Sequence, residues 1–569
     1  MLISEQGSHE IATAKRPISS KRFDERGAWT IPGSYAPGQA ATHPLRILIV
    51  ATEAPPVRGG IARIVGYLRD GLQGRGHHVD VLAYPEVGRL VFGEVRLSSL
   101  IFKLPQLFHR VNEYDIIHVH GVTPTFSDLF LLFVHLRNPR LPVIYTHHLD
   151  LDFTPAFLTG MYNRLHHWLS AHTSAVVAAT DHTLALLHDK RGRGSVIPYG
   201  IDLAHFSTNR RKDEQFTVLF VGQFRPWKGV RILLQAMSQV KNARLLLVGQ
   251  GPEEQAYRSL AKELDLDVQF YIGVNDDSLR QLYERAHVIV LPSISQLEAF
   301  GLALIEGMAA GCIPIASDLP GVREVVGRIG FLFPPGDANE LATILRDLLN
   351  NPEQVQQTAE YARMYATQFS QDRTICEYER LFTCLVAARE LKEQIEQITH
   401  KTQSYAPALQ QFMSHVARDL EADWAGLVLQ EAQDKFRFVA FTGSLSLLTR
   451  QQLERVSSQL AWSAMNTDDS IRLEPHDDNL HLDEVLVREM PAVIAVPLII
   501  DGKRIGAMLS MRERSFDQYD LDSLKRFAFY AAPSLRAIIK LNDGIPGLAK
   551  ELNDGIPGLA KDFASTTPS

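Results

Sequence analysis

Short apolar segments alternate with helical patterns along the first two thirds of the chain. Apolar residues recur at helical spacing from Ile61 to Leu72, and strand-like runs occupy residues 45–52, 78–84, 115–121, 141–148, 174–180 and 195–202. The series begins again with strand-like runs at residues 216–223, 243–251, 268–273, 287–291 and 312–316. Strands that alternate with helices predict parallel sheets with helices on both faces. We therefore predict an α/β protein with two consecutive Rossmann-like lobes, over residues 44–200 and 201–370.

The pattern changes after the second lobe. Residues 371–420 keep apolar residues at helical spacing, and we interpret them as a crossing helix followed by a connector. Strict apolar alternation then predicts two β-hairpins, with strands at residues 424–430, 436–443 and 492–513. The second hairpin contains Asp501-Gly502, a dipeptide typical of two-residue hairpin turns. Residues 421–540, which end in a helical pattern, are therefore predicted to form a smaller α+β domain.

Both ends of the chain lack these patterns. Residues 1–43 mix Lys, Arg, Ser, Gly and Pro without an apolar centre, so we expect a disordered N-terminal tail. Residues 541–569 contain two tandem 11-residue copies, LNDGIPGLAKE and LNDGIPGLAKD. Because a solenoid needs about three or more repeats, we expect a flexible tail there.

The composition excludes several classes of protein. The net charge of −7 argues against a general nucleic-acid binder. Three cysteines are too few for a disulfide framework or a cysteine metal cluster. The chain has no apolar run long enough for a transmembrane helix and no signal-peptide pattern at its start. These features predict a cytoplasmic protein.

Two glutamates eight residues apart carry the most informative chemistry. Glu298 follows the strand-like run that ends at Leu291, and Glu306 lies about two turns into the next helical pattern. Ligands bind at the carboxyl ends of strands in open α/β sheets, where a helix N-terminus is suited to phosphate. The glutamates stand in the context Phe300-Gly301-Leu302, followed by Gly311. This arrangement resembles the family 4 retaining glycosyltransferases, with their Glu-x7-Glu motif and GT-B fold.

The resemblance implies a set of donor-binding residues. Gly59 and Gly60 match a glycine loop that approaches the donor diphosphate, and Lys228 matches a lysine that neutralises charge on the leaving group. Family members commonly carry Arg where Gln223 stands, and Arg225 is a candidate to compensate. The remaining matches are His120 and Glu298 at the sugar, Glu306 at the ribose, Gly273 beside the base, and Phe300, Gly301 and Leu302 in the motif loop.

The C-terminal domain resembles a GAF domain. The match rests on the Val496-Pro-Leu strand, its turn, the Ile505-Gly-Ala-Met-Leu-Ser strand and a closing helix. The domain contains no cysteine, which excludes a thioether-linked bilin there. We expect this part to be regulatory or to mediate homodimerisation.

Together these resemblances predict a retaining, metal-independent glycosyltransferase without a cofactor. It would transfer a sugar from a nucleoside-diphosphate sugar, bound on the C-terminal lobe, to a glycan, lipid-linked or small-molecule acceptor on the N-terminal lobe. Two alternatives stay open. One is a GT-B-type nucleotide-sugar epimerase, and the other is an inactive nucleotide-sugar sensor, for which the missing arginine at Gln223 is the support.

Other motifs add less. Gly249-x-Gly251 lacks the third glycine of a dinucleotide fingerprint, so we reject nicotinamide binding. The pair His147-His148 has no further ligands at a suitable spacing, and Asp150-x-Asp152 lacks the context of a metal-dependent transferase, so no metal site is predicted. The amphipathic stretch Ser98 to Val111 fits either a core-facing helix or a peripheral contact with a membrane surface.

Overall fold

The computed structural model describes most of the chain between residues 43 and 541. The described segments are 43–57, 59–83, 89–92, 95–98, 110–121, 126–150, 156–187, 189, 192–206, 212–327, 329–399, 404–432, 435–443, 450–466, 470–474 and 492–541. The predicted N-terminal tail, both copies of the repeat apart from Leu541, and residues 99–109 of the amphipathic stretch lie outside these segments. The described residues belong to one unit, Gly38–Ser569.

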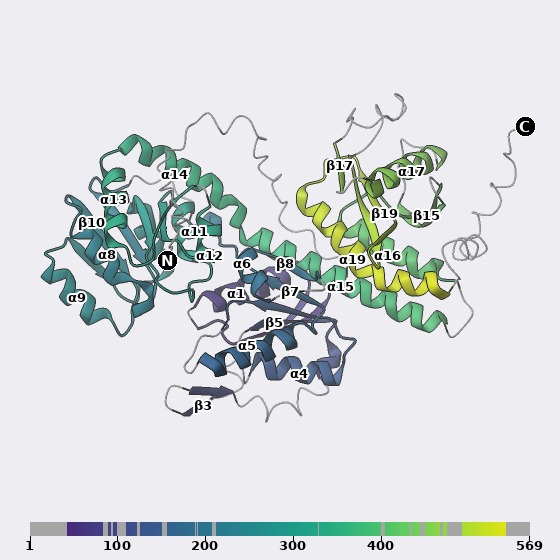
Figure 1. The fold of residues 1–569 in the computed structure, drawn as a ribbon, viewed down its shortest axis with the longest axis horizontal. Coiled ribbons are helices and arrows are strands. Elements are labelled where there is room, and N and C mark those ends of the chain that lie inside the picture. Colours follow the sequence, from purple (N-terminus) through teal and green to yellow (C-terminus); the bar gives the residue numbers. More distant parts are fainter. Residues whose placement is uncertain are drawn as a thin grey trace, which may run out of the picture. The chain divides into compact units, whose positions relative to one another are not determined.

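The first lobe is a six-stranded parallel sheet with the order β2-β1-β5-β6-β7-β8. Its strands β1, β2, β5, β6, β7 and β8 span Arg46–Ala51, His78–Ala83, Ile116–Gly121, Val143–His147, Ala175–Ala178 and Gly194–Val196. Helices α1, α4, α5 and α6 span Gly60–Gly74, Ser127–Arg137, Ala156–Ser170 and Asp181–Leu186. Side chains of α1 and of α4 belong to different apolar cores, one on each face of the sheet. Helices pack against the sheet of this lobe (Figure 1). Burial on both faces explains why strands such as β1 and β7 are continuous apolar runs.

The second lobe is another six-stranded parallel sheet, with the order β11-β10-β9-β12-β13-β14. Strands β9 to β14 span Phe216–Val221, Ala243–Val248, Val268–Tyr271, Val288–Leu291, Ile313–Ser317 and Phe331–Phe333. Helices α8 to α14 span Val230–Met237, Glu254–Glu263, Asp276–Arg285, Leu302–Ala309, Pro320–Val326, Ala338–Leu349 and Pro352–Ala366. Helices α8, α9 and α13 cover one face, while α10, α11 and α12 cover the other. The two Rossmann-like lobes predicted from the sequence are thus confirmed.

One long helix, α15 (Gln371–Thr399), contributes to two cores. The chain enters it beside the first lobe, where Ile201 forms an isolated parallel bridge with Ser370. Ile375, Tyr378, Leu381 and Phe382 of α15 pack in the core that includes α1. Further along, its buried side chains Cys384, Leu391 and Ile395 pack in the core of the C-terminal domain. Cys376 and Cys384 of α15 are buried and form no disulfide.

The C-terminal domain is a five-stranded antiparallel sheet with the order β16-β15-β19-β18-β17. Strands β15 to β19 span Trp424–Ala432, Lys435–Gly443, Ile471–Leu473, Ala492–Ile500 and Lys503–Arg512. Helices α16 (Ala406–Asp419) and α19 (Gln518–Leu541) cover one face with the end of α15, and α17 (Arg450–Asn466) covers the other. Asp501 and Gly502 have φ of 50° and 74°, so the predicted Asp-Gly hairpin turn is present.

Strands β3 (Arg89–Phe92) and β4 (Val95–Ser98) form a separate antiparallel hairpin that the pattern analysis did not predict. Among the helices that the structure describes, none combines the length and apolar character that crossing a bilayer requires.

Candidate active site

The candidate residues lie where the strand order of each sheet reverses. In the second lobe, the order runs outward in opposite directions from β9 and β12. Lys228 follows β9, and Glu298 follows β12. In the first lobe, the reversal lies between β1 and β5, which precede Gly60 and contain His120. Crevices at the carboxyl ends of the strands flanking such a reversal are the usual ligand sites of open α/β sheets.

Lys228 and Glu298 form an ion pair at this edge of the second lobe. The Lys228 ammonium donates to Oε2 of Glu298, and the Ser293 hydroxyl donates to the same oxygen at 3.2 Å. Both charged side chains are largely buried, with 15% and 10% of their surface exposed. The Lys228 ammonium also lies 4.5 Å from the centre of the Trp227 ring. A cation and a carboxylate are therefore held together at the topological switch point.

A tight backbone turn fixes Lys228. The 3₁₀ turn Pro226–Lys228 ends at Gly229, which has φ of 69°. A Cβ at Gly229 would come within 1.8 Å of the carbonyl oxygen of Pro292, so this position requires glycine. Because β9 ends at Val221, strand alternation does not set the direction of the Arg225 side chain. Gln223 and Arg225 are both exposed.

The motif loop leads into helix α11. Gly301 caps the helix with φ of 86°, and a Cβ there would lie 2.9 Å from Cδ2 of Leu291. Leu302 starts the helix, so the amide groups that lack intrahelical partners lie next to the motif loop that follows β12. Phe300 is buried, and its ring centre lies 4.9 Å from that of Tyr199. The loop thus holds the helix N-terminus, which favours anionic groups, close to Glu298.

Glu306 is buried within α11 and already has two partners. Arg63 of α1 donates to Oε1, and the Tyr283 hydroxyl donates to Oε2 at 2.7 Å. Burial raises the pKa of the Glu306 carboxyl, and the positive charge of Arg63 opposes that rise. The same pair raises the pKa of Arg63. Since both donors serve the ionised carboxylate, we assign the pair as charged at neutral pH.

His120 belongs to a buried group of histidines in the first lobe. Its Nδ1 lies 3.2 Å from Nε2 of His148, whose Nδ1 is hydrogen-bonded to the Tyr199 hydroxyl. His118 is bonded through Nε2 to Oγ1 of Thr146 at 2.7 Å. The buried Nε2 of His120 has no hydrogen-bond partner among the described residues. Burial lowers the pKa of His118 and of His148 to about 3, and it also lowers the pKa of His120. These imidazoles are therefore neutral at pH 7.

These depressed pKa values predict that the protein loses stability in mild acid. His118 has a pKa of about 3 in the folded protein, against 6.5 when unfolded. Its stabilising contribution is thus complete above pH 6.5 and is lost as the pH falls from 6.5 toward 3, by about 1.4 kcal/mol per pH unit. Denaturant titrations at pH 7.5, 6.5 and 5.5 give the free energy of unfolding for the first unfolding transition at each pH. The His118→Asn variant should lower its pH dependence by about one proton, and an unchanged dependence would refute the assignment.

The remaining glycines differ in their surroundings. Gly59 caps α1, and a Cβ there would lie 2.3 Å from Oε2 of Glu53. A Cβ at Gly60 would make an ordinary contact, 3.6 Å from Cδ1 of Leu302. Gly273, after β11, has φ of 64° and is exposed. Movement of the flexible Glu53 side chain would admit a Cβ at Gly59, whereas the left-handed conformation of Gly273 favours glycine.

Sequence reasoning did not identify four residues that contact the predicted set. His148 was considered only as a metal ligand, and Tyr199 only as part of a strand-like run. Arg63 of α1 and Tyr283 of α10, the partners of Glu306, are not residues of any predicted motif. Their only signal in the sequence is a polar residue within a helical apolar pattern, which does not reveal its partner.

Comparisons with known proteins match the three folded parts separately. The family described as Glycosyltransferase Family 4 matches residues 58–205, and the family described as Glycosyl transferases group 1 matches residues 203–365. A GAF domain matches residues 404–536. The candidate residues His120, Lys228, Glu298 and Glu306 all lie within the first two matches.

Relatives of known or assigned activity agree with these families. The chain is 27% identical over 377 residues to the O-antigen chain mannosyltransferase C of Escherichia coli, which covers 61% of this chain and 100% of that protein. It is 28% identical over 341 residues to a phosphatidyl-myo-inositol mannosyltransferase of Mycolicibacterium smegmatis, covering 54% of this chain and 86% of the relative.

Solved structures share the fold. A sucrose-phosphate synthase from Thermosynechococcus elongatus aligns with a TM-score of 0.51 at 23% identity, covering 60% of this chain and 100% of the other. A glycosyltransferase from Rickettsia africae gives a TM-score of 0.51 at 18% identity, covering 60% and 99%. With two parallel lobes, the matched families and these relatives, the chain belongs to the group 1 glycosyltransferases of family 4, with a GT-B fold and a C-terminal GAF domain.

Proposed function

We propose that the enzyme transfers a sugar from a nucleoside-diphosphate sugar to an acceptor hydroxyl with retention of anomeric configuration. The pairing of Lys228 with Glu298 at the switch point of the second lobe carries this proposal. Lys228 would neutralise the charge that develops on the leaving diphosphate, together with the N-terminus of α11. Glu298 would accept hydrogen bonds from the transferred sugar. The pair holds both side chains in place, so little reorganisation is needed when the donor binds.

The other candidates take supporting roles in this proposal. Gly59 and Gly60 let the backbone approach the diphosphate, and the unpartnered Nε2 of the neutral His120 would meet the sugar. Glu306 is proposed to accept from the ribose hydroxyls. Because its oxygens already serve Arg63 and Tyr283, ribose binding requires exchange of at least one of these partners. Arg225 is proposed to assist at the diphosphate where Gln223 provides no charge.

Turnover should not depend on a divalent metal at the diphosphate, because Lys228 and the helix N-terminus supply the positive field there. Initial rates with saturating donor are therefore expected to be unchanged by EDTA. The measurement compares EDTA alone with EDTA followed by excess Mg²⁺, Mn²⁺ or Zn²⁺. A rate that falls with EDTA and returns with Mg²⁺ or Mn²⁺, but not with Zn²⁺, would contradict metal-independent transfer.

The test of the proposed function begins with the donor. A thermal-shift screen of nucleoside diphosphates and nucleoside-diphosphate sugars identifies which nucleotide base the enzyme binds. A ligand at about 100 times its Kd stabilises the folded protein by about 2.7 kcal/mol. The stabilising sugar nucleotide is then incubated with and without acceptors. Acceptor-dependent release of the nucleoside diphosphate supports transfer. An epimer formed from the sugar nucleotide alone would support the epimerase, and binding without turnover would support the sensor.

We further propose a lipid-linked or membrane-associated acceptor. The mycobacterial relative is named as acting on phosphatidyl-myo-inositol, and the Escherichia coli relative as acting on an O-antigen chain. In the acceptor lobe, α5 exposes an apolar stripe with 53–71% of each side chain accessible, made of Phe157, Met161, Leu165 and Trp168. Arg164 is exposed on the same helix, and Leu136 of α4 is 74% exposed. An exposed apolar stripe with Trp and Arg fits a bilayer surface that carries anionic lipids.

Charging this stripe should weaken membrane binding. The double variant Met161→Asp and Trp168→Asp is expected to bind anionic phospholipid vesicles about a hundredfold or more weakly, because each buried apolar side chain contributes about 1.5–3 kcal/mol. Co-sedimentation with vesicles measures the effect. Met364→Asp is the matched control, since Met364 is 62% exposed on α14 of the other lobe. Equal sedimentation of the double variant and the control would contradict this docking surface.

The GAF domain is proposed to regulate the transferase through α15. The helix packs both in the core that includes α1 and helices of the second lobe and in the GAF core, so a shift of one core would be transmitted to the other along one continuous helix. Ion pairs reinforce the contact, because Arg380 and Glu377 of α15 pair with Asp520 and Arg526 of α19. The GAF domain therefore contacts a helix that also supports the acceptor lobe. Homodimerisation is a second role that we propose for the GAF domain.

A further inference from the structure

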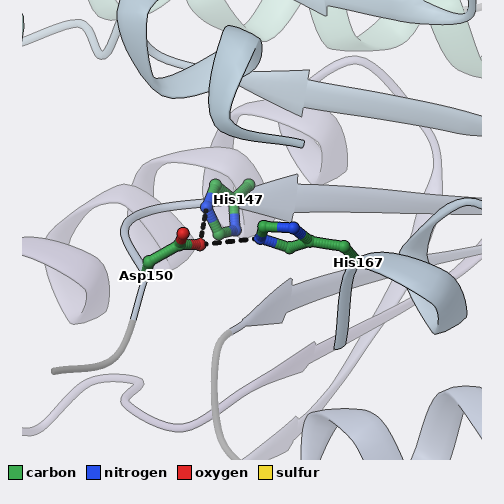
Figure 2. A group of neighbouring side chains, drawn as sticks. All are labelled: His147, Asp150 and His167. Atoms are coloured by element: carbon green, nitrogen blue, oxygen red, sulfur yellow. Dashed lines mark hydrogen bonds and ion pairs between the residues drawn. The ribbon is translucent and has the colours of Figure 1, made fainter. Parts of the chain in front are cut away.

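Three side chains meet at the carboxyl end of β6, outside the donor site. His147 is the last residue of β6, Asp150 follows it in the loop, and His167 lies on α5 (Figure 2). Nε2 of His147 lies 3.1 Å from Oδ1 of Asp150, and Nε2 of His167 lies 2.9 Å from the same oxygen. One ligand atom from each residue lies within 4.8 Å of the others. Two imidazoles and a carboxylate thus converge from three consecutive elements of the first lobe.

His147 lacks the hydrogen bonds that a buried imidazole normally makes. Its side chain is fully buried, yet neither Nδ1 nor Nε2 has a hydrogen-bond partner among the described residues. The contact with Asp150 is close, but it does not have hydrogen-bond geometry. Buried polar nitrogens without partners are costly, and native structures contain few of them. An unsatisfied nitrogen directed at a carboxylate and a second imidazole is the arrangement that a bound cation would satisfy.

We infer that His147, Asp150 and His167 form a binding site for a transition-metal ion of the zinc class. Imidazole ligands favour Zn²⁺ over Mg²⁺ or Ca²⁺, which prefer oxygen ligands. Zinc bonds of about 2.0–2.2 Å in tetrahedral geometry place neighbouring ligand atoms roughly 3.4 Å apart. The two separations from Oδ1 of Asp150, 3.1 and 2.9 Å, require only small movements to reach that value. Two histidines and one carboxylate leave a fourth position for water.

The surroundings give the ion access and a structural role. The side chains of Asp150 and His167 are 28% and 21% exposed, so an ion can enter from solvent while His147 anchors it from within. The ion would link β6, the loop after it and α5. The neighbouring residue His148 is bonded to His120 and Tyr199. The inferred ion therefore fixes the backbone next to the buried histidine group and takes no part in the transfer proposed above.

The sequence alone did not reveal this site because its ligands come from different elements. His147 and Asp150 are three residues apart, but His167 lies a helix away on α5. The competing explanation is a hydrogen-bonded His–Asp–His group in which Asp150 bonds His167. That group would bind no metal tightly, so metal affinity separates the two explanations.

The test uses the full chain stripped of metal with EDTA and then exchanged into chelator-free buffer. Titration with Zn²⁺ is followed by calorimetry, and Co²⁺ serves as a spectroscopic probe because tetrahedral Co²⁺ absorbs strongly in the visible region. The chain holds 21 histidines, so weak binding elsewhere is expected and variants are essential. His167→Gln and Asp150→Asn replace the two partly exposed ligands. His172→Gln is the matched control, because His172 lies just after α5 and outside the cluster.

We expect one tight equivalent of Zn²⁺, a tetrahedral Co²⁺ spectrum and a raised Tm in the wild type and in the His172→Gln control. Loss of an outer partner of a ligand already costs about 10–100-fold in metal affinity. Each ligand variant should therefore weaken Zn²⁺ binding by roughly a hundredfold or more and lose the Co²⁺ spectrum. Wild-type binding no tighter than that of His167→Gln and Asp150→Asn would overturn the inference. A failure of sugar transfer would leave it standing, since metal binding is read without turnover.

Discussion

Replacing Lys228 with alanine is expected to lower kcat about a hundredfold to a thousandfold, the typical cost of losing one preorganised group that stabilises transition-state charge. Lys228 is held against Glu298 and over Trp227, so its charge is positioned before the reaction begins. The measurement is the steady-state rate of donor consumption at saturating acceptor. Because Glu298 also loses its ion-pair partner and keeps only the Ser293 hydroxyl among its described side-chain donors, the Tm of the variant must be measured beside the rate.

Three further variants separate the role of Lys228 from those of Gln223 and Arg225. Gln223→Ala should cost much less than Lys228→Ala, because Gln223 is exposed and carries no charge. Arg225→Ala should be severe only if Arg225 compensates for the missing arginine, in which case Gln223→Arg should bring little gain. A Lys228→Ala enzyme that keeps wild-type kcat would remove Lys228 from the leaving-group site.

Replacing Asp520 with alanine is expected to destabilise the GAF domain by about 3–5 kcal/mol, the usual cost of breaking a buried ion pair. Asp520 is only 4% exposed and accepts from two arginines, Arg380 of α15 at 2.8 Å and Arg512 of β19 at 2.5 Å. Its removal leaves both guanidinium groups without this acceptor. Calorimetric unfolding of the full chain measures the change in the transition that contains the GAF domain.

A neighbouring aspartate provides the control. Asp522 lies on the same helix and accepts only from Gln518 among its described hydrogen-bond partners, so Asp522→Ala should change stability by less than about 0.5 kcal/mol. If α15 couples the domains, Asp520→Ala should also alter transferase kinetics, and Asp522→Ala should not. A strongly destabilised GAF domain with unchanged kinetics would argue against regulation through α15.

The sequence predicted the lobes well because their strands are buried on both faces. Runs such as residues 45–52 and 216–223 have no polar alternation, and the structure places β1 and β9 there as central strands. The hairpin of the GAF domain was also predictable, since Asp501-Gly502 readily adopts the positive φ angles of a two-residue hairpin turn. The position of Lys228 and Glu298 after neighbouring strands followed from the same logic, because parallel strands end at one edge.

Contacts between distant elements were not accessible in the same way. The pairing of Glu306 with Arg63 joins two helices 243 residues apart, and no local pattern encodes it. The meeting of His147 with His167 depends on how α5 returns across the end of β6. The double role of α15 was also hidden, because an apolar pattern shows that a face is buried but not against which core.

The anomeric configuration of the product tests the central proposal most directly. The full chain is incubated with an acceptor and with the sugar nucleotide that stabilises it, in which the sugar is α-linked to the diphosphate. Proton NMR follows the anomeric signals during the reaction. Retaining transfer predicts an α-linked product formed in step with the released nucleoside diphosphate. A β-linked product, or an epimerised sugar nucleotide without any acceptor product, would contradict it.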